Sequence, residues 1–259
     1  MHGSFIWYEL MTPDAEAAGR FYSAVVPGWT FGEPMPGEVN YRAIGRSDGG
    51  NAGGVLQIDE SMRSHGAHPA WLGYIGVDDV DMAVGQVESA GGSVLMPAWD
   101  VPDVGRIAMV ADPQGVPFYV MKPIPPEGRE GEDSDVFSAT AEQRVGWNEL
   151  TTTDPAAARQ FYGDLFGWTS DDFMPMGEMG EYRFLAHAGE TIGAVCGVQP
   201  GGSKGWRYYI RVPSIGSAAE AVKSGGGTVA MGPMEVPGGD HIIIGQDPQG
   251  AEFALVGKA

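Results

Sequence analysis

The chain contains one sequence pattern twice, and this duplication constrains its fold more than any other feature. Residues 7–22 and 147–162 lie 140 positions apart and are identical at 9 of 16 positions. Residues 91–121 and 226–256 lie 135 positions apart and are identical at 12 of 31. A repeat of this length is a duplicated domain rather than a solenoid unit, because each copy is large enough to bury its own core.

The duplication predicts two domains within the 259 residues, covering residues 1–123 and 145–259. Between them, residues 124–144 are rich in proline, glycine and acidic side chains and lack apolar periodicity. Such a composition is typical of an extended, solvated linker.

In each half of each copy, the residue pattern predicts one helix among several short strands. A β-branched and aromatic run predicts a strand over residues 5–10. Asp14 then predicts a helix start, because its carboxylate can accept hydrogen bonds from the free amides of the first turn. The order repeats in the second half, so the chain holds four βαβββ modules. In the first copy we expect strands at 5–10, 41–45, 54–58, 72–77, 93–98, 106–111 and 117–121, and helices at 15–25 and 82–90.

Composition excludes several classes of function. With 34 acidic and 15 basic residues, the net charge is −19, which repels nucleic-acid phosphates and anionic membranes. Residues 1–10 show no secretory signal, and no apolar stretch is long enough to span a bilayer. Cys196 is the only cysteine and lies in an apolar run, so we expect a buried core thiol in a cytoplasmic protein without disulfides.

The chain resembles the vicinal oxygen chelate superfamily, which includes glyoxalase, bleomycin resistance proteins and extradiol dioxygenases. The resemblance covers both copies and is closest to tandem, two-domain actinobacterial members. It implies an α+β fold in which four βαβββ modules form two glyoxalase-like domains with cup-shaped mixed sheets. It rests on Asp14…Phe21-Tyr22…Gly28-Trp29, Asp154…Phe161-Tyr162…Gly167-Trp168, Asp112-Pro113-Gln114-Gly115 and Asp247-Pro248-Gln249-Gly250.

The resemblance also implies a divalent metal held inside the cup by His, Gln and Glu. The corresponding positions here are Trp7 and Trp147 on the first strands, Tyr119 and Ala254 on the last strands, and the neighbourhood of Leu72 and Arg207 on the fifth strands. These side chains are poor ligands for such an ion, so we expect neither a metal nor another cofactor. A displaced metal site would have to use Glu9, Glu149, His65, His68 and His241.

Strand alternation predicts which other side chains line the cups. Because positions 7 and 147 align with cup-facing positions, the glutamates two residues later should face the cup as well. The alternative is that the tryptophans fill the core and the glutamates pair with an arginine. An inward Arg207 is expected to pair with Glu149. The candidate ligand-binding residues are Trp7, Glu9, Tyr74, Tyr119, Trp147, Glu149, Arg207, Tyr209 and His241.

These features leave several functions open. The first is metal-free binding of a hydrophobic, aromatic small molecule, with the second cup as the roomier and more polar site. The second is an enzyme, either with displaced metal ligands or with metal-free acid–base catalysis by Glu149 and His241. A scaffold with vestigial cups is the third. The duplication suggests either a monomer with an internal pseudo-dimer or a homodimer.

Overall fold

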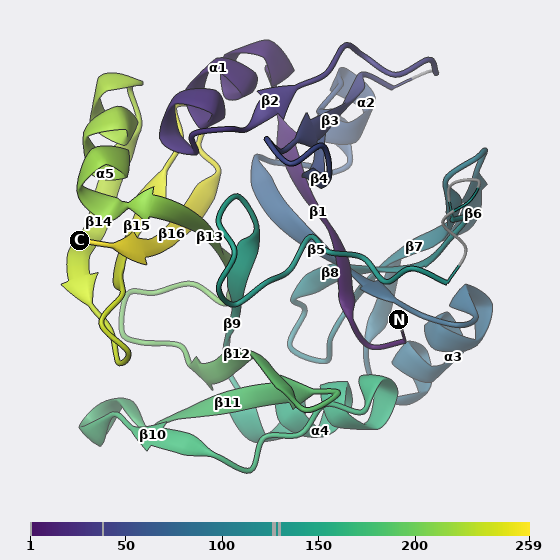
Figure 1. Cartoon of the computed structure of the whole chain (residues 1–259). Helices are drawn as coiled ribbons and strands as arrows, with labels where there is room; N and C mark the ends of the chain where they lie inside the picture. The colour runs from purple at the N-terminus through teal and green to yellow at the C-terminus, as the bar shows by residue number, and fades with distance from the viewer. Residues whose placement is uncertain (1, 38, 126–127, 129–130) are drawn as a thin grey trace. The chain divides into compact units, whose positions relative to one another are not determined.

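The computed structural model describes residues 2–37, 39–125, 128 and 131–259 (Figure 1). Its elements follow the predicted order of four modules. The first module contains β1 (Phe5–Thr12), α1 (Ala15–Val25), β2 (Thr30–Phe31), β3 (Tyr41–Gly45) and β4 (Asn51–Gln57), followed by α2 (Glu60–Ser64). The second contains β5 (Ala70–Gly76), α3 (Val80–Ser89), β6 (Ser93–Val101), β7 (Gly105–Ala111) and β8 (Pro117–Pro123).

The second copy repeats this arrangement. The third module contains β9 (Val145–Thr152), α4 (Pro155–Phe166), β10 (Phe173–Pro175), η1 (Gly177–Met179), β11 (Glu181–His187) and β12 (Glu190–Gly197). The fourth contains β13 (Gly205–Ser214), α5 (Ile215–Ser224), β14 (Thr228–Glu235), β15 (His241–Gln246) and β16 (Glu252–Lys258).

The predicted helix start at Asp14 is confirmed, since its carboxylate accepts a hydrogen bond from the amide of Ala17. The short helix α2 was not predicted. It is capped by Asp59 and lies between the strands expected at residues 54–58 and 72–77. Five residues are too few for a helical periodicity to be recognised.

The strands form two eight-stranded sheets. Their orders are β2-β3-β4-β1-β5-β8-β7-β6 and β10-β11-β12-β9-β13-β16-β15-β14. In each module the first and last strands run parallel, and the other paired strands are antiparallel. This confirms the predicted α+β class with two mixed sheets.

The chain forms two compact units, and each combines a module of one copy with a module of the other. Unit 1 consists of residues 1–6, 73–134 and 148–206, and thus holds the second and third modules. Unit 2 consists of residues 7–72, 135–147 and 207–259, and holds the first and fourth modules. Within these units α3 packs near α4 and α1 packs near α5 (Figure 1).

The repeated helix and turn motifs bind one another within unit 2. The buried Tyr22 hydroxyl donates a hydrogen bond of 3.1 Å to Asp247 and accepts one of 3.0 Å from the indole of Trp71. Beside it, Phe21 packs edge-on against Phe253 at a ring separation of 5.8 Å. A Cβ atom on Gly227 would stand 2.9 Å from the Phe21 ring, so the helix end needs glycine there. Burial raises the pKa of Tyr22 well above its usual value.

Unit 1 repeats this arrangement with the other two modules. The Tyr162 hydroxyl donates to Asp112 at 3.3 Å and accepts a hydrogen bond of 3.1 Å from Trp206. Burial raises the pKa of Asp112, although hydrogen bonds from two backbone amides and from Tyr162 oppose the shift. The motifs that carry the family resemblance therefore hold modules of different copies together.

The segment before β9 contacts the first module inside unit 2. The Trp29 indole donates to the backbone oxygen of Gln143 at 2.9 Å. Arg144 binds Asp48 and Asp135 at 2.7 and 2.9 Å, and the buried Arg46 side chain reaches the same two carboxylates. Two arginines and two aspartates thus tie residues 135–144 to the turn between β3 and β4.

Helices in the described part of the chain fall short of what a membrane crossing requires in length and apolar character.

Candidate binding faces

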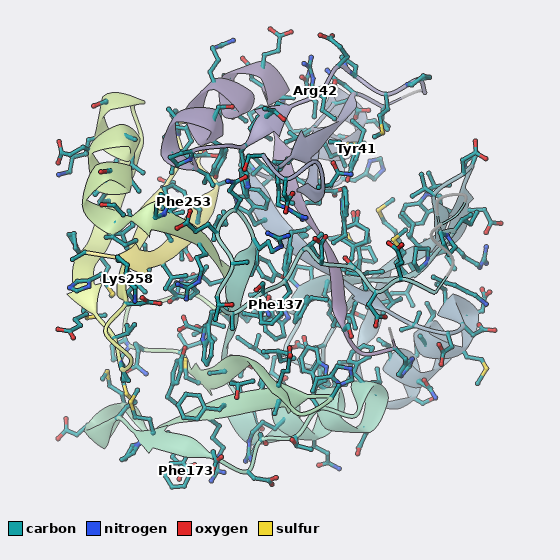
Figure 2. The ribbon with its side chains drawn as sticks, viewed as in Figure 1. Tyr41, Arg42, Phe137, Phe173, Phe253 and Lys258 are labelled. Atoms are coloured by element: carbon teal, nitrogen blue, oxygen red, sulfur yellow. The ribbon has the colours of Figure 1, made fainter. Side chains whose placement is uncertain are left out.

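Each sheet has a face that packs under the helices and an opposite face, here called the inner face. In the fourth module, Phe253 packs against α1, so the odd-numbered side chains of β16 lie on the helix side. Ala254 and Val256 alternate with them and lie on the inner face. Figure 2 labels one β16 residue of each kind, Phe253 and Lys258.

The inner face of the fourth module is an apolar floor that supports Trp147. Half-buried Trp147 and Val236 pack on this floor, and both the floor and the indole belong to unit 2. The floor residues share one face of the sheet because they are paired in register across neighbouring strands. Ala254 of β16 pairs with Tyr209 of β13 and with Ile244 of β15, and Val256 pairs with Ile242. The floor consists of Tyr209, Ile242, Ile244, Ala254 and Val256.

Ion pairs border this floor. Arg207 binds one Glu252 carboxylate oxygen through Nε and Nη2, each at 2.9 Å. Arg211 binds Asp240 at 2.8 Å, and Lys258 binds the same carboxylate at 2.6 Å. Burial opposes ionisation of Asp240, but Lys258 and Arg211 outweigh it and lower its pKa. The result is a buried apolar cluster in contact with half-buried Trp147, with charged groups at its borders. The expected pairing of Arg207 with Glu149 stays a prediction, because the two residues belong to different units.

His241 does not join Trp147 on this floor. Its neighbour Ile242 belongs to the floor, and the unbroken register of β15 with β16 places His241 on the other face by alternation. Its ring is half-buried, and its Nδ1 atom has no hydrogen-bond partner among the described residues. Sequence reasoning misplaced it because it is the first residue of its strand, where the phase of alternation is not visible from the pattern.

The third module brings Glu149 together with a residue that sequence reasoning missed. The Tyr182 hydroxyl donates a hydrogen bond of 2.7 Å to the Glu149 carboxylate, which is buried with 8% of its surface exposed. Cys196 lies on the same face and is half-buried, with its Sγ 3.9 Å from the Thr151 hydroxyl. The expectation of a fully buried core thiol at Cys196 was therefore wrong.

In the first module, Trp7 donates a hydrogen bond of 2.6 Å from its indole to the hydroxyl of Tyr41, which Figure 2 labels. The Tyr41 ring lies directly over Gly54, where any Cβ would collide with it. Glu9 is paired in register with Gly54 and is only 2% exposed. The carboxylate and the indole thus share one strand face, as alternation predicts.

The second module carries a stacked tyrosine pair. Tyr74 and Tyr119 are paired in register, and their rings lie 4.2 Å apart at an interplanar angle of 15°. Both are buried, at 6% and 4% exposure. Met109 lies on the same face as these rings because it pairs in register with Tyr119, and Met121 lies there because it follows Tyr119 by two residues on β8. This face is occupied by packed aromatic and thioether groups.

Tyr41 and Tyr182 had a recognisable signal. A Tyr-Arg dipeptide followed by two apolar residues occurs at residues 41–44 and again at 182–185. The two tyrosines occupy equivalent positions on β3 and β11. In the first copy Tyr41 accepts a hydrogen bond from the Trp7 indole, and in the second copy Tyr182 donates one to the Glu149 carboxylate.

The residues at the positions implied for a metal do not suit one. Trp147 packs on the floor that contains Ala254, so an indole and a methyl group stand where ligands would be. Arg207 carries a positive charge and is bound to Glu252. Trp7 donates its indole N–H to Tyr41, and Tyr119 stacks on Tyr74. Among the described residues, no three His, Cys, Asp or Glu side chains gather closely enough to hold an ion.

The remaining histidines bind backbone atoms near them or elsewhere in unit 1. His65 and His68 are exposed and bind backbone oxygens within their own loop. His2 contacts the Leu165 carbonyl at 3.1 Å. Burial lowers the pKa of half-buried His187, while its hydrogen bond with His2 opposes that shift.

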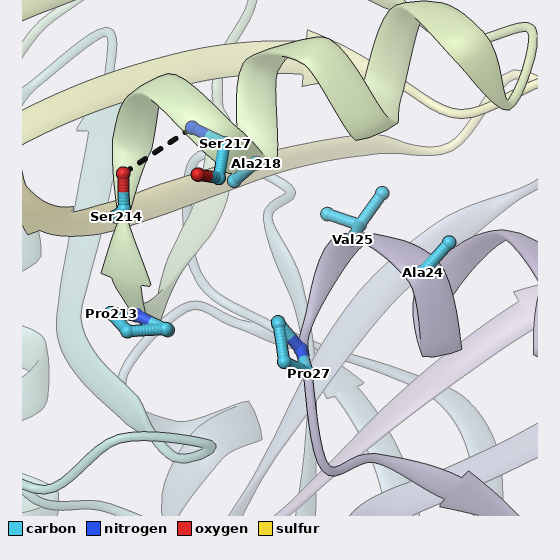
Figure 3. Close-up of a pocket in the computed structure, with 7 residues that line it drawn as sticks. All are labelled: Ala24, Val25, Pro27, Pro213, Ser214, Ser217 and Ala218. Carbon is cyan, nitrogen blue, oxygen red and sulfur yellow. Dashed lines mark hydrogen bonds between the residues drawn. The ribbon is translucent and has the colours of Figure 1, made fainter.

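A cavity of about 50 Å³ lies between the end of α1 and the start of α5 in unit 2 (Figure 3). Its lining is apolar apart from Ser214 and Ser217, which are joined by the hydrogen bond that begins α5. It is too small for an aromatic ligand, since ligand pockets usually measure about 300–1,000 Å³.

The chain belongs to the Glyoxalase/Bleomycin resistance protein/Dioxygenase superfamily, whose family model matches residues 4–120 and 144–255. It is 31% identical over 258 residues to "Putative glyoxylase CFP32" of Mycobacterium bovis, covering 98% of this chain and 94% of that protein. It is 32% identical over 270 residues to "Anthracycline biosynthesis protein DnrV" of Streptomyces peucetius, covering 98% and 93%.

A solved structure shows the same fold. The Mn(II)-bound glyoxalase from Novosphingobium aromaticivorans matches with a TM-score of 0.63 at 16% identity, covering 99% of this chain and 82% of that one.

Proposed function

We propose that this protein binds a flat, hydrophobic aromatic small molecule on the inner face of the fourth module, without a metal ion. The observation that carries the proposal is the half-buried Trp147 on a floor of aliphatic side chains and Tyr209. An indole with one face packed and part of its surface open offers a stacking partner to a planar ring.

The bordering charges support a ligand with polar substituents. Arg207 with Glu252 and Arg211 with Asp240 are paired, so each can orient a hydroxyl or carbonyl group without presenting an unpaired charge. One relative is named for anthracycline biosynthesis. Anthracyclines carry fused aromatic rings of the flat kind that such a floor would accept.

The first test is native mass spectrometry of the purified protein, compared with its denatured mass. We expect additional mass from an organic molecule and none from a metal. A stoichiometric divalent ion would contradict the metal-free proposal and would direct attention to Glu9, Glu149, His65, His68 and His241.

Replacing Trp147 by alanine is expected to weaken binding of an aromatic ligand by about 1–3 kcal/mol, because the stacking surface is lost. Isothermal titration calorimetry with a ligand identified by mass spectrometry would measure the change. Trp7→Ala is the matched control, since Trp7 is the equivalent residue of the first copy and is held by Tyr41. If Trp7→Ala lost more ligand affinity than Trp147→Ala, the result would indicate that the ligand binds on the first module instead.

Removing divalent ions with EDTA is expected to leave the melting temperature unchanged within about 1 °C, because metal binding normally adds to folding free energy. Differential scanning fluorimetry before and after chelation measures this. A drop of several degrees that manganese or zinc reverses would refute the metal-free proposal.

An enzyme without a metal is the alternative, and one observation favours it. The buried Glu149 carboxylate and the Tyr182 hydroxyl lie 2.7 Å apart, a pair that can hold and move a proton. Glu149→Gln would abolish turnover of a candidate substrate but preserve binding on the fourth module's floor. Binding without turnover in the unmodified protein would favour a carrier or sequestering role.

We also propose that the chain acts as a monomer in which the two copies form an internal pseudo-dimer. Size-exclusion chromatography with light scattering tests this, and a mass near twice 27.4 kDa would indicate a homodimer instead. The net charge of −19 makes nucleic acids and anionic membranes unsuitable partners.

A further inference from the structure

A second cavity, of about 330 Å³, lies on the helix side of the third module. It is bounded by the start of α4, by η1, by β11 and by the end of β12. Arg183 of β11 pairs in register with Val195, whereas its neighbour Phe184 pairs with Ala194, the partner of Glu149. Arg183 and this cavity therefore lie on the face opposite Glu149 and Tyr182.

Two arginines line the cavity, and one of them, Arg183, is paired with a carboxylate. Arg183 donates from Nε to Glu181 at 2.7 Å and from Nη1 to the Ser170 carbonyl at 3.2 Å. Its guanidinium also lies 4.6 Å from the centre of the Phe173 ring. Its charge is thus balanced by a carboxylate and supported by an aromatic face.

Arg159 of α4 has no such balance. Its Nη1 donates a long hydrogen bond of 3.4 Å to the Ser170 hydroxyl. Its Nε is buried and has no hydrogen-bond partner among the described residues. No carboxylate in the described part of the chain lies within ion-pair distance of it. A shielded guanidinium donor without a partner is costly unless water or a ligand satisfies it.

The first copy fills the equivalent space. Aligning Tyr22-Trp29-Thr30 with Tyr162-Trp168-Thr169 places Gly19 opposite Arg159 and Phe31 opposite Ser170. The Phe31 ring packs directly over Gly19, where an added Cβ would stand 3.1 Å from it. A glycine–phenylalanine contact in one copy is thus replaced by an arginine–serine contact in the other, beside an open cavity.

We propose that this cavity binds the carboxylate group of a small organic monoanion, with Arg159 as its main partner. Asp154 accepts the capping hydrogen bond from Ala157 and Glu181 binds Arg183, so Arg159 is the lining cation without a carboxylate partner among the described residues. The two arginines and two carboxylates of the lining cancel in charge, so a ligand with one negative charge suits the cavity better than a ligand with two. The second Nη of Arg159, which makes no hydrogen bond to a described residue, can donate charge-assisted hydrogen bonds to a carboxylate in the cavity. Met179 and Pro155 supply apolar walls for the organic part.

Titration of the full chain with benzoate, followed by two-dimensional NMR, tests the proposal. We expect saturable shifts at residues lining the cavity, and Arg159→Gln should weaken benzoate binding about tenfold or more. Arg20→Gln is the matched control, because Arg20 is exposed on the equivalent helix of the first copy, and it should leave binding unchanged.

Two further measurements keep the proposal falsifiable. The double variant Arg159→Gly with Ser170→Phe restores the first copy's pair and should abolish binding while the protein stays folded. Benzyl alcohol, which lacks the charge, should not bind. Equal binding of benzyl alcohol, tighter binding of inorganic phosphate than of benzoate, or undiminished benzoate binding by Arg159→Gln would each overturn the proposal.

Discussion

Replacing Asp247 by alanine is expected to lower the free energy of unfolding by about 3–5 kcal/mol, because three donors lose their acceptor. One carboxylate oxygen accepts from the amides of Gln249 and Ala251 at 2.9 and 3.0 Å, and the other accepts from the Tyr22 hydroxyl. Asp247 is 5% exposed and Tyr22 is fully buried, so water cannot replace these bonds. Urea denaturation followed by circular dichroism measures the change.

Asp171→Ala provides the control for this experiment, since Asp171 is exposed, and its loss should change stability by less than about 0.5 kcal/mol. Tyr22→Phe removes one of the three bonds to Asp247 and also the hydrogen bond that Tyr22 accepts from Trp71, so it should cost about 1–3 kcal/mol. If Tyr22→Phe destabilises the Asp247→Ala protein as much as it destabilises the unmodified chain, the two residues are not coupled and the proposed role of the motif is contradicted.

The sequence predicted the modules well because their signals are local. Asp14 and Asp154 cap helices through their own side chains, and the strands alternate over enough residues to be recognised. The fold class follows from repetition of this order. None of these inferences required knowledge of which modules meet.

The function of the repeated motifs could not be predicted in the same way. Tyr22 and Asp247 lie 225 positions apart and belong to different copies, as do Tyr162 and Asp112. Their pairing depends on how modules combine into units, which is a long-range property. Nothing in the sequence paired Tyr22 with Asp247 or Tyr162 with Asp112, and their hydrogen bonds give the repeated motifs a structural role.

The candidate site was predicted in part for a similar reason. Alternation placed Trp147 with Tyr209 and Ala254, because all three lie well inside their strands. It failed for His241, which begins β15. The repeated Tyr-Arg dipeptide could have marked Tyr182 as a candidate, but its partner Glu149 lies 33 positions away, so their hydrogen bond could not be predicted from the sequence.

Replacing Arg46 by methionine is expected to lower the free energy of unfolding by about 2–4 kcal/mol, since it removes a buried charge from between two carboxylates. The Arg46 side chain is 1% exposed and binds Asp48, Asp135 and the backbone oxygen of Asn51. Methionine keeps most of the apolar volume of the arginine side chain. The decrease in the free energy of unfolding therefore measures the loss of the polar contacts. Arg63→Met is the control, because that arginine is exposed and should cost less than about 0.5 kcal/mol.

The stability difference between the unmodified chain and Arg46→Met should also depend on pH. The Gly50 amide, Arg46 and Arg144 lower the pKa of Asp48. Burial opposes ionisation of Asp135, but the two arginines outweigh it and lower its pKa as well. A carboxylate with a lowered pKa stabilises the fold above its unfolded pKa, near 3.9, and loses that contribution as the pH falls below it. The stability difference between the unmodified chain and Arg46→Met should therefore stay constant from pH 7 to 5 and shrink below pH 4. A difference that persists unchanged at pH 3, or that is absent at pH 7, would show that the four-residue ion-pair network does not hold residues 135–144 in place.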